Sequence, residues 1–218
     1  MELKIFELKL ENNELERRDI PKVRGYLANK FPQYIELHNH IDGDKFRYGY
    51  PLIQYKTIGK TPYIIGINEG ADVLMKIEDD IEDIDIRKSV VKVYEKGYTF
   101  KKSLLKERED MVQYRFITPW MALNQMNHRK YLELDQWEDK VKLLESILKG
   151  NLLSLCKNFD YRIQKHIEIL LKVRPIKVNF KNNTMVAFKG KFKVNIDIPD
   201  YLGIGKSVSR GFGTIKRS

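Results

Sequence analysis

Residues 184–198, TMVAFKGKFKVNIDI, show the clearest strand pattern in the chain. Apolar and polar residues alternate there, as in a β-strand with one buried face. The apolar set is Val186, Phe188, Phe192, Val194, Ile196 and Ile198, whereas the opposite set includes Lys189, Lys191 and Lys193. We therefore expect a core-facing side and a row of lysines, which lies either on a solvated sheet face or on an RNA-facing one.

The residues around this strand predict the rest of a sheet. Residues 166–181 form a second strand candidate, and Asn182–Asn183 suits a tight hairpin between the two. The apolar phase changes at Pro175, which predicts a β-bulge. Upstream, we expect a strand at 111–118 and a long helix with Asp135 as its N-cap, whose leucines recur every three or four residues from Trp137 to Leu155.

The first half of the chain predicts the order βαββαβ. We expect strands at 2–10, 46–57, 61–67 and 87–95, a helix at 20–31 after the cap Asp19, and a helix from the cap Asn68 to residue 78. A lysine-rich connector would span 96–109, after which the same order begins again. The prediction is an α+β fold with two tandem ferredoxin-like domains, residues 1–103 and 104–218.

The net charge of +10 lies entirely in the last part of the chain. Residues 156–218 contain fourteen Lys and Arg against four Asp and Glu, whereas residues 1–155 contain twenty-six of each. This excess predicts either a surface for a polyanion or a merely solvated basic face. The acidic run at 78–85 indicates a solvated helix end and loop, because no other metal-ligating residues converge on it.

Other features limit the class of protein. The single Cys156 excludes an internal disulfide, and its apolar helical neighbours predict a buried structural thiol. We see no secretory signal and no run of eighteen apolar residues, so we expect a cytoplasmic protein that does not contact a membrane. We predict neither a cofactor nor a metal.

Residues 203–218, GIGKSVSRGFGTIKRS, form a basic, glycine-rich segment. A Walker A loop would need glycine at Asp200, and a dinucleotide fingerprint would need glycine at Val208, so neither fits. Glycines allow close approach of backbone N–H groups to a ligand, and cations attract phosphates. We therefore predict RNA contacts for Gly203, Gly205, Lys206, Ser207, Arg210, Gly211, Phe212 and Gly213.

Two histidines are candidates for catalysis. His38 and His40 would project from the same side of an extended segment, about 7 Å apart by strand rise. Cleavage of RNA without a metal needs a base for the 2′-OH and an acid for the leaving 5′-oxygen, and histidine titrates near neutral pH. The pair could also simply form hydrogen bonds within a loop or, as the weaker alternative, bind a metal. Lys30 and Tyr48 are possible positioning groups, or an ordinary surface lysine and a core tyrosine.

The glycine-rich segment resembles the corresponding loop of the RAMP superfamily of CRISPR-associated proteins. With residues 46–56, FRYGYPLIQYK, and 117–124, ITPWMALN, the chain resembles the subtype b-like branch of the Cas-six family, apart from the interrupting Gly49. The resemblance implies a metal-independent endoribonuclease that cleaves CRISPR repeat RNA and leaves 5′-hydroxyl and 2′,3′-cyclic phosphate ends. It favours His40 first and His38 second for catalysis, with Lys30 and Tyr48 as electrostatic or positioning groups.

Two other functions remain open. One is a non-catalytic RNA-binding subunit of a CRISPR effector complex, which would have other CRISPR-associated proteins as partners. The second, a metal-dependent nuclease, would need an acidic ligand cluster that the sequence does not show. The sequence is compatible with a monomer or a homodimer.

Overall fold

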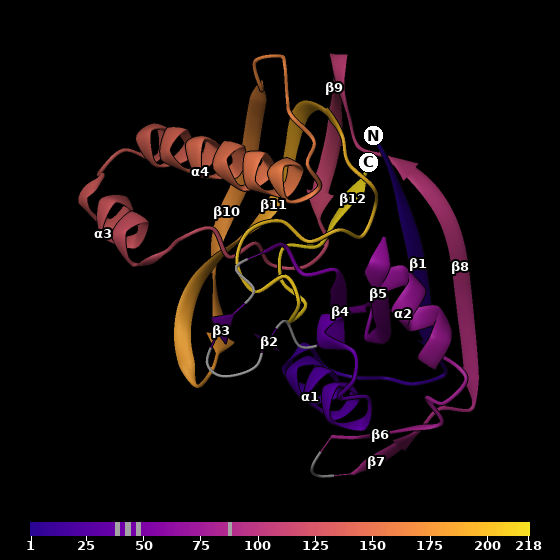
Figure 1. Ribbon diagram of the computed structural model, residues 1–218. Helices are drawn as coiled ribbons and strands as arrows, with labels where there is room; N and C mark the ends of the chain where they lie inside the picture. Colours follow the sequence, from indigo (N-terminus) through magenta and orange to yellow (C-terminus); the bar gives the residue numbers. More distant parts are fainter. Residues whose placement is uncertain (38–39, 42–44, 47–48, 87–88) are drawn as a thin grey trace. The chain divides into compact units, whose positions relative to one another are not determined.

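The protein forms two compact units, each built around a four-stranded sheet. The structure, a computed structural model, describes residues 1–37, 40–41, 45–46, 49–86 and 89–218, with only the backbone of 40–41 and 45–46 (Figure 1). The N-terminal unit comprises Glu2–Ser103 and Val208–Gly211. The C-terminal unit comprises Met1, Leu104–Ser207 and Phe212–Ser218. The predicted α+β class is confirmed.

The N-terminal unit has the ferredoxin-like strand order β4-β5-β1-β8. Its main elements are β1 (Glu2–Glu11), α1 (Ile20–Lys30), β4 (Ile53–Ile58), β5 (Thr61–Ile67), α2 (Glu69–Ile77) and β8 (Glu95–Leu104). Both helices share one apolar core with β1, to which Leu8, Leu27 and Leu74 contribute. The smaller elements are η1 (Arg17–Asp19), η2 (Ile35–Leu37), the hairpin β2 (His40–Ile41) and β3 (Lys45–Phe46), and the hairpin β6 (Asp83–Asp85) and β7 (Val90–Lys92).

Several predictions for this unit were wrong in extent. The second main strand begins at Ile53, not at residue 46. The fourth strand is β8 rather than 87–95, and the supposed lysine-rich connector lies largely in β8 and β9. Most β8 side chains are exposed or half-buried, so the segment lacks the apolar alternation that would have revealed it. The acidic run includes β6, because Ile84 is buried between two aspartates.

The C-terminal unit repeats the strand order but has no helix before its last strand. Its elements are β9 (Lys106–Phe116), α3 (Gln125–Glu133), α4 (Trp137–Asn158), β10 (Ile169–Phe180), β11 (Asn183–Asp197) and β12 (Ile215–Arg217), in the sheet order β10-β11-β9-β12. No helix lies between β11 and β12, where all residues are described. The glycine-rich segment occupies that connection, so the second βαββαβ prediction was wrong in its last helix.

Helix α4 packs against β10, and in the view of Figure 1 it passes in front of β10 and β11. The predicted leucine repeat is confirmed, because Leu144, Leu148, Leu152 and Leu155 are all buried. The N-cap is Gln136, one residue after the expected Asp135. Helix α3 was not expected from the sequence, since only Tyr131 among its side chains is buried.

The β10–β11 hairpin is regular where a bulge was predicted. Its turn consists of Lys181 and Asn182, both with positive φ as in a type I′ turn, one residue earlier than expected. Pro175 pairs with Phe188 within an unbroken register, so the bulge prediction was wrong. The change of apolar phase lies beside Gly190. Its φ of +147° is rare for residues other than glycine, and a Cβ added there would overlap the backbone of β10.

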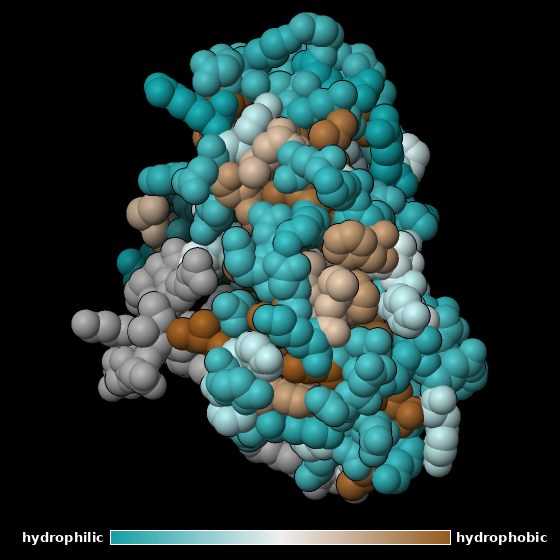
Figure 2. Space-filling view, turned by 45° about the vertical axis from the view of Figure 1, so that its right-hand side comes forward, coloured by the Kyte–Doolittle hydropathy of each residue, from teal (hydrophilic) through white to brown (hydrophobic). Residues whose placement is uncertain are grey.

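The face of the protein seen in Figure 2 is mainly hydrophilic. Figure 2 shows hydrophilic residues over most of the face in view, with hydrophobic residues in separate patches. Among the described residues, none of the helices has the length and apolar content required to span a membrane.

Candidate nucleic-acid interface

Both ends of the glycine-rich segment of residues 203–213, namely 203–207 and 212–213, fold tightly on the C-terminal unit. Ile204 N donates a hydrogen bond to Gly213 O, and Lys206 N donates one to Met121 O. Gly205 and Gly213 both have positive φ. A Cβ at Gly213 would overlap Ile204 O, and one at Gly205 would lie 2.6 Å from Trp120 Nε1. These two glycines are therefore required for packing within the protein, whatever contact the segment makes with a ligand.

The predicted loop residues differ in their accessibility. Phe212 is only 3% exposed and packs edge-on against Phe180, with 5.6 Å between ring centroids. Its ring is therefore a core side chain and is not available to stack on a base. Lys206 is the exposed member of the set; Gly205, Ser207 and Arg210 are half-buried, and Gly203, Gly211, Phe212 and Gly213 are buried.

Arg210 lies in the part of the segment that belongs to the N-terminal unit. Its backbone forms a parallel bridge with Tyr55 of β4. Burial lowers the pKa of Arg24 on α1, and the positive charge of Arg210 lowers it further. Two guanidinium groups therefore lie close together beside β4, where an anion would be stabilised. Arg24 was not predicted from the sequence, although it is a charged residue on the same helical stripe as Ile20 and Leu27.

The predicted catalytic residues are only partly described. His38 and Tyr48 lie outside the described residues, and the structure gives only the backbone of His40, which pairs with Phe46 between β2 and β3. Lys30 is the exposed last residue of α1, and its Nζ donates a hydrogen bond to Asp80 O at 2.8 Å. The same Nζ lies 5.7 Å from the ring centroid of Tyr26. The catalytic roles stay predictions.

The predicted lysine row is exposed on β11. Lys189, Lys191 and Lys193 are all accessible, whereas Phe188 and Phe192 between and beside them are buried. Trp120 stacks on Phe116 with 5.2 Å between centroids, and its Nε1 donates a hydrogen bond to Asn151 on α4. The aromatic face of the sheet is therefore the one that α4 covers, and the lysines point to the other side.

A buried lysine was not anticipated from the sequence. Lys56 in β4 is fully buried, and its Nζ donates a hydrogen bond to Gln54 Oε1 at 3.0 Å. Burial lowers the pKa of Lys56 to about 7, an effect that the negative charge of Glu7 partly opposes. Tyr55 and Lys56 are consecutive, so they point to opposite faces of β4, and both are buried. Nothing in the sequence indicated that both faces of this strand are covered.

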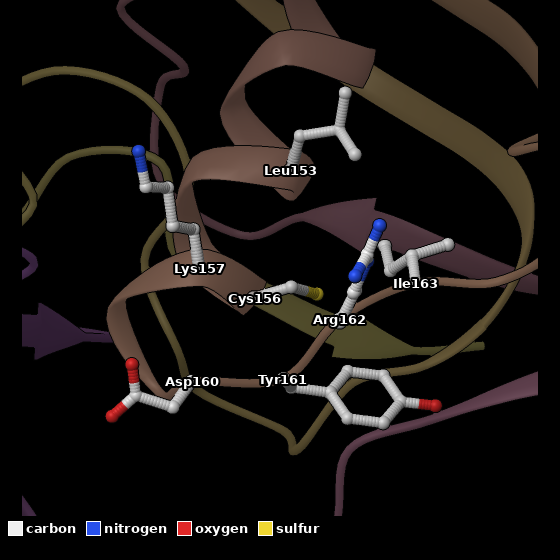
Figure 3. Close-up of a pocket in the computed structure, with 7 residues that line it drawn as sticks. All are labelled: Leu153, Cys156, Lys157, Asp160, Tyr161, Arg162 and Ile163. Atoms are coloured by element: carbon white, nitrogen blue, oxygen red, sulfur yellow. The ribbon is translucent and has the colours of Figure 1, made fainter.

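The cysteine is confirmed as a buried thiol. Cys156 lines a pocket of about 360 Å³ with Tyr161 and Arg162, among other residues (Figure 3). Burial raises the pKa of Cys156 to about 11, so the thiol stays protonated at neutral pH. A protonated thiol is a poor nucleophile, which supports a structural role.

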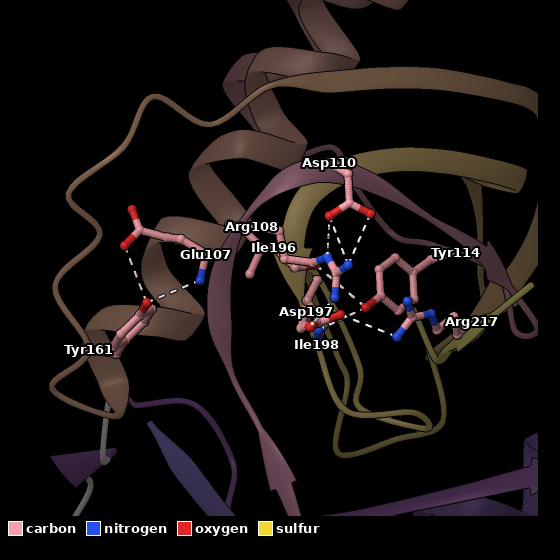
Figure 4. A network of polar contacts seen from close by, with 9 residues as sticks. All are labelled: Glu107, Arg108, Asp110, Tyr114, Tyr161, Ile196, Asp197, Ile198 and Arg217. Atoms are coloured by element: carbon pink, nitrogen blue, oxygen red, sulfur yellow. Dashed lines mark hydrogen bonds and ion pairs between the residues drawn. The ribbon is translucent and has the colours of Figure 1, made fainter.

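Charged residues at one end of the C-terminal sheet are paired with each other (Figure 4). Asp197 accepts from Arg108 at 2.9 Å and forms an ion pair with Arg217 at 3.3 Å. Arg108 also pairs with Asp110. The network connects β9, β11 and β12. These carboxylates therefore stabilise the sheet and do not form an open metal site.

Comparisons with known proteins cover almost the whole chain. A family model described as Cas6b N-terminal domain matches residues 1–103, and one described as Cas6b C-terminal domain matches residues 106–218. A crystal structure of Cas6b is 36% identical, with a TM-score of 0.95 and complete coverage of both chains. A crystal structure of a CRISPR RNA processing endoribonuclease, Cas6b, is 35% identical, with a TM-score of 0.81 and complete coverage of both.

A further relative has no described function. An uncharacterized protein from Methanocaldococcus jannaschii is 46% identical over 110 residues, which are 50% of this chain and 74% of that protein.

Proposed function

Because the chain belongs to the Cas6b family, we propose that it is an endoribonuclease that cleaves CRISPR repeat RNA. The observation that carries the proposal is the match of both family domains, together with 36% identity to a Cas6b structure over the full length. The related structure described as a CRISPR RNA processing endoribonuclease supports the same reaction.

The proposed reaction needs no metal ion. A base removes the 2′-OH proton, and the 2′-oxygen attacks the adjacent phosphorus in line with the leaving group. The bond from phosphorus to the 5′-oxygen breaks, and an acid donates a proton to that oxygen. The products are a 2′,3′-cyclic phosphate and a 5′-hydroxyl. His40 and His38 are proposed to supply the acid and the base between them, in an order that a substrate with a 5′-sulfur leaving group would assign. Each such role contributes about 10²- to 10⁴-fold in rate.

The remaining predicted residues would bind and orient the RNA. Lys30 and Tyr48 are proposed to position the scissile phosphate. Lys206 and Arg210 are proposed to hold other phosphates, and Arg210 has a second cation beside it in Arg24. Lys189, Lys191 and Lys193 would follow the RNA backbone, while Phe212 and the glycines support the loop by packing.

The test compares two RNAs in the presence of EDTA. Purified protein is incubated with the repeat RNA of its own host and with a copy that carries a 2′-deoxy nucleotide immediately upstream of the cut. We expect cleavage of the first only, because the second lacks the nucleophile. Cleavage of both copies would exclude the 2′-OH mechanism, and loss of all cleavage in EDTA would indicate a metal-dependent nuclease. Tight binding without cleavage, with or without Mg²⁺, would favour a non-catalytic RNA-binding subunit.

A further inference from the structure

Four basic residues form a line across the whole C-terminal sheet. In the strand register, Lys172 of β10 lies opposite Lys191 of β11, Lys191 lies opposite Arg115 of β9, and Arg115 lies opposite Lys216 of β12. We call these four residues the cross-strand basic row. Neighbouring strands are about 4.8 Å apart, so the row extends for about 14 Å across the strands.

More cations flank this row on the same side of the sheet. Residues directly opposite each other point to the same side, as do residues two apart in one strand. Arg174 and Lys189 form the next opposed pair, and Lys193 lies on the other side of the row. Lys216 is half-buried, whereas the other six cations are exposed.

Among the described residues, six of these cations lack the acidic partners that other charged residues of the unit have. In the part of the chain that the structure describes, no ion pair with a carboxylate involves Arg115, Lys172, Arg174, Lys189, Lys191 or Lys193. Arg108 and Arg217, at the end of the same sheet, both pair with Asp197. Like charges directly opposite each other are destabilising, so the row weakens the isolated fold, and a bound polyanion would relieve that repulsion.

The side chains around the row are suited to phosphates and not to bases. Sheets of this ferredoxin-like type that read single-stranded RNA stack bases on exposed aromatic side chains. Here four aromatic residues of the long strands, Tyr114, Phe116, Phe188 and Phe192, are buried on the opposite side. Phe180, at the hairpin end of β10 on the side of the row, is half-buried and packs edge-on against Phe212. The outward neighbours of the row are cations, Gln113 and Leu170.

The row is also continuous with the glycine-rich segment. Lys216 lies in β12, which begins two residues after Gly213, the last residue of that segment. In the segment itself, Phe212 packs in one cluster with Ala187 of β11. Ala187 precedes Lys189 by two residues, so it lies on the same side of the strand as the lysines. A pocket of about 380 Å³ lies among Lys172, Lys191 and Lys193, and the Glu145 side chain, which accepts a hydrogen bond from Leu171 N, also lines it.

We propose that the cross-strand basic row binds the phosphate backbone of the RNA without reading its bases, and thereby contributes affinity that is independent of sequence. This inference rests on the proposed function for the identity of the polyanion. Its distinguishing consequence is that removal of the row weakens the binding of any RNA strand by the same factor.

The test is a triple variant, Arg115→Gln, Lys172→Gln and Lys191→Gln. Binding is measured from 50 to 300 mM salt for the uncleavable 2′-deoxy repeat RNA and for a scrambled RNA of equal length. Three lost contacts to a single strand should reduce the slope of log affinity against log salt by about 2, which corresponds to about 100-fold weaker binding at 0.1 M salt. We expect the same loss for both RNAs.

A matched control variant removes three positive charges at positions outside the row. Lys76→Gln, Lys102→Gln and Lys130→Gln remove three exposed lysines that lie outside the row. If both triple variants bind alike, the row does not bind RNA, and an acidic protein would be the partner to examine. A loss confined to the repeat RNA would overturn the sequence-independent role.

The two proposals fail in different ways. A wild-type protein that binds both RNAs through the row but cuts neither would overturn the proposed nuclease and leave this inference standing. A wild-type protein that cuts the repeat while the row variant keeps full affinity would overturn the inference alone.

Discussion

A Cβ atom at Gly205 would lie 2.6 Å from Nε1 of Trp120, so the glycine-rich segment passes directly against that indole. Trp120 is fully buried, and Nε1 donates a hydrogen bond to Asn151 Oδ1 at 3.2 Å. Because Asn151 lies in α4, the tryptophan connects the segment to the helix that covers the sheet. Glycine at this position therefore allows the segment to lie directly against the indole.

Replacement of Gly205 by Ala should destabilise the protein. The new methyl group would overlap the indole, and φ of +92° is unfavourable for alanine. Strain and overpacking of about 1–3 kcal/mol each give a loss of about 2–6 kcal/mol in the free energy of unfolding. Urea unfolding monitored by tryptophan fluorescence measures this loss. A variant that loses RNA affinity at unchanged stability would contradict the packing role.

The matched control is Gly150→Ala. Gly150 lies in α4, and no atom lies within 4 Å of where its Cβ would be. Alanine is the better helix former, so this variant should gain about 0.5–1 kcal/mol in the free energy of unfolding.

The Tyr114 hydroxyl stabilises the end of β11. It accepts a hydrogen bond from Ile198 N at 2.8 Å and donates a longer one to Ile196 O (Figure 4). Burial raises the pKa of Tyr114 to about 12, so the hydroxyl remains protonated. Tyr114→Phe would leave the Ile198 N–H unpaired and should lower the free energy of unfolding by about 1–3 kcal/mol.

Thermal or urea unfolding of Tyr114→Phe is compared with that of Tyr94→Phe. Tyr94 is 87% exposed, so its substitution should change the free energy of unfolding by less than about 0.5 kcal/mol. Equal stability of the two variants would show that the Tyr114 hydroxyl contributes nothing.

Lys56 should make stability depend on pH. Its pKa is about 7 in the folded protein, well below the ordinary value of 10.5. Between these values the unfolded chain binds a proton that the folded protein lacks, so the free energy of unfolding rises with pH by up to about 1.4 kcal/mol per unit. Below about pH 7 the lysine is charged in both states, and the slope disappears.

The pH dependence is measured as the difference between two proteins. Urea unfolding at pH 7, 8.5 and 10 is compared for wild type and Lys56→Met, so that other titrating groups cancel. We expect the rise with pH to be smaller in the variant, and unchanged in the control Lys76→Gln, which removes an exposed lysine. Identical slopes in wild type and Lys56→Met would show that Lys56 keeps an ordinary pKa.

Local patterns predicted the elements that pack on one side. The alternation in the middle of β11, over residues 188–194, and the leucines of α4 were read correctly because each of these stretches has one buried and one exposed face. Pro21 in the first turn of α1 and Asn68 before α2 also marked helix starts that the structure has. Such signals are sufficient to predict a helix or a strand, because they arise from residues that are close together in the sequence.

Features that depend on distant partners were not predictable. The phase change in β10 was assigned to Pro175, but Gly190 on the partner strand accompanies it. The lysines of β11 were visible as a row along one strand, whereas Arg115 and Lys172 join them only through the pairing of three strands. Likewise, Lys56 is buried by residues far away in the sequence, so no local signal separates it from an exposed lysine.

Replacement of His40 or His38 by Ala should reduce cleavage and leave RNA binding intact. If the histidines are the acid and base, each substitution lowers the single-turnover rate by about 10²- to 10⁴-fold. Affinity for the 2′-deoxy repeat RNA should change little, because the phosphate contacts remain. His128→Ala, at a half-buried position in α3, is the control and should cleave at the wild-type rate. Normal cleavage by the double variant His38→Ala, His40→Ala would remove both residues from the mechanism.

A modified substrate can assign the two roles. A repeat RNA with sulfur in place of the 5′-oxygen at the cut has a leaving group that departs without a proton, so it no longer needs the general acid. The variant that lacks the acid should therefore recover most of its rate on this RNA, whereas the variant that lacks the base should remain slow, because the 2′-OH must still lose its proton. Recovery of one histidine variant and not the other would identify the acid. Equal recovery, or none in either, would show that the two histidines do not divide the proton transfers between them.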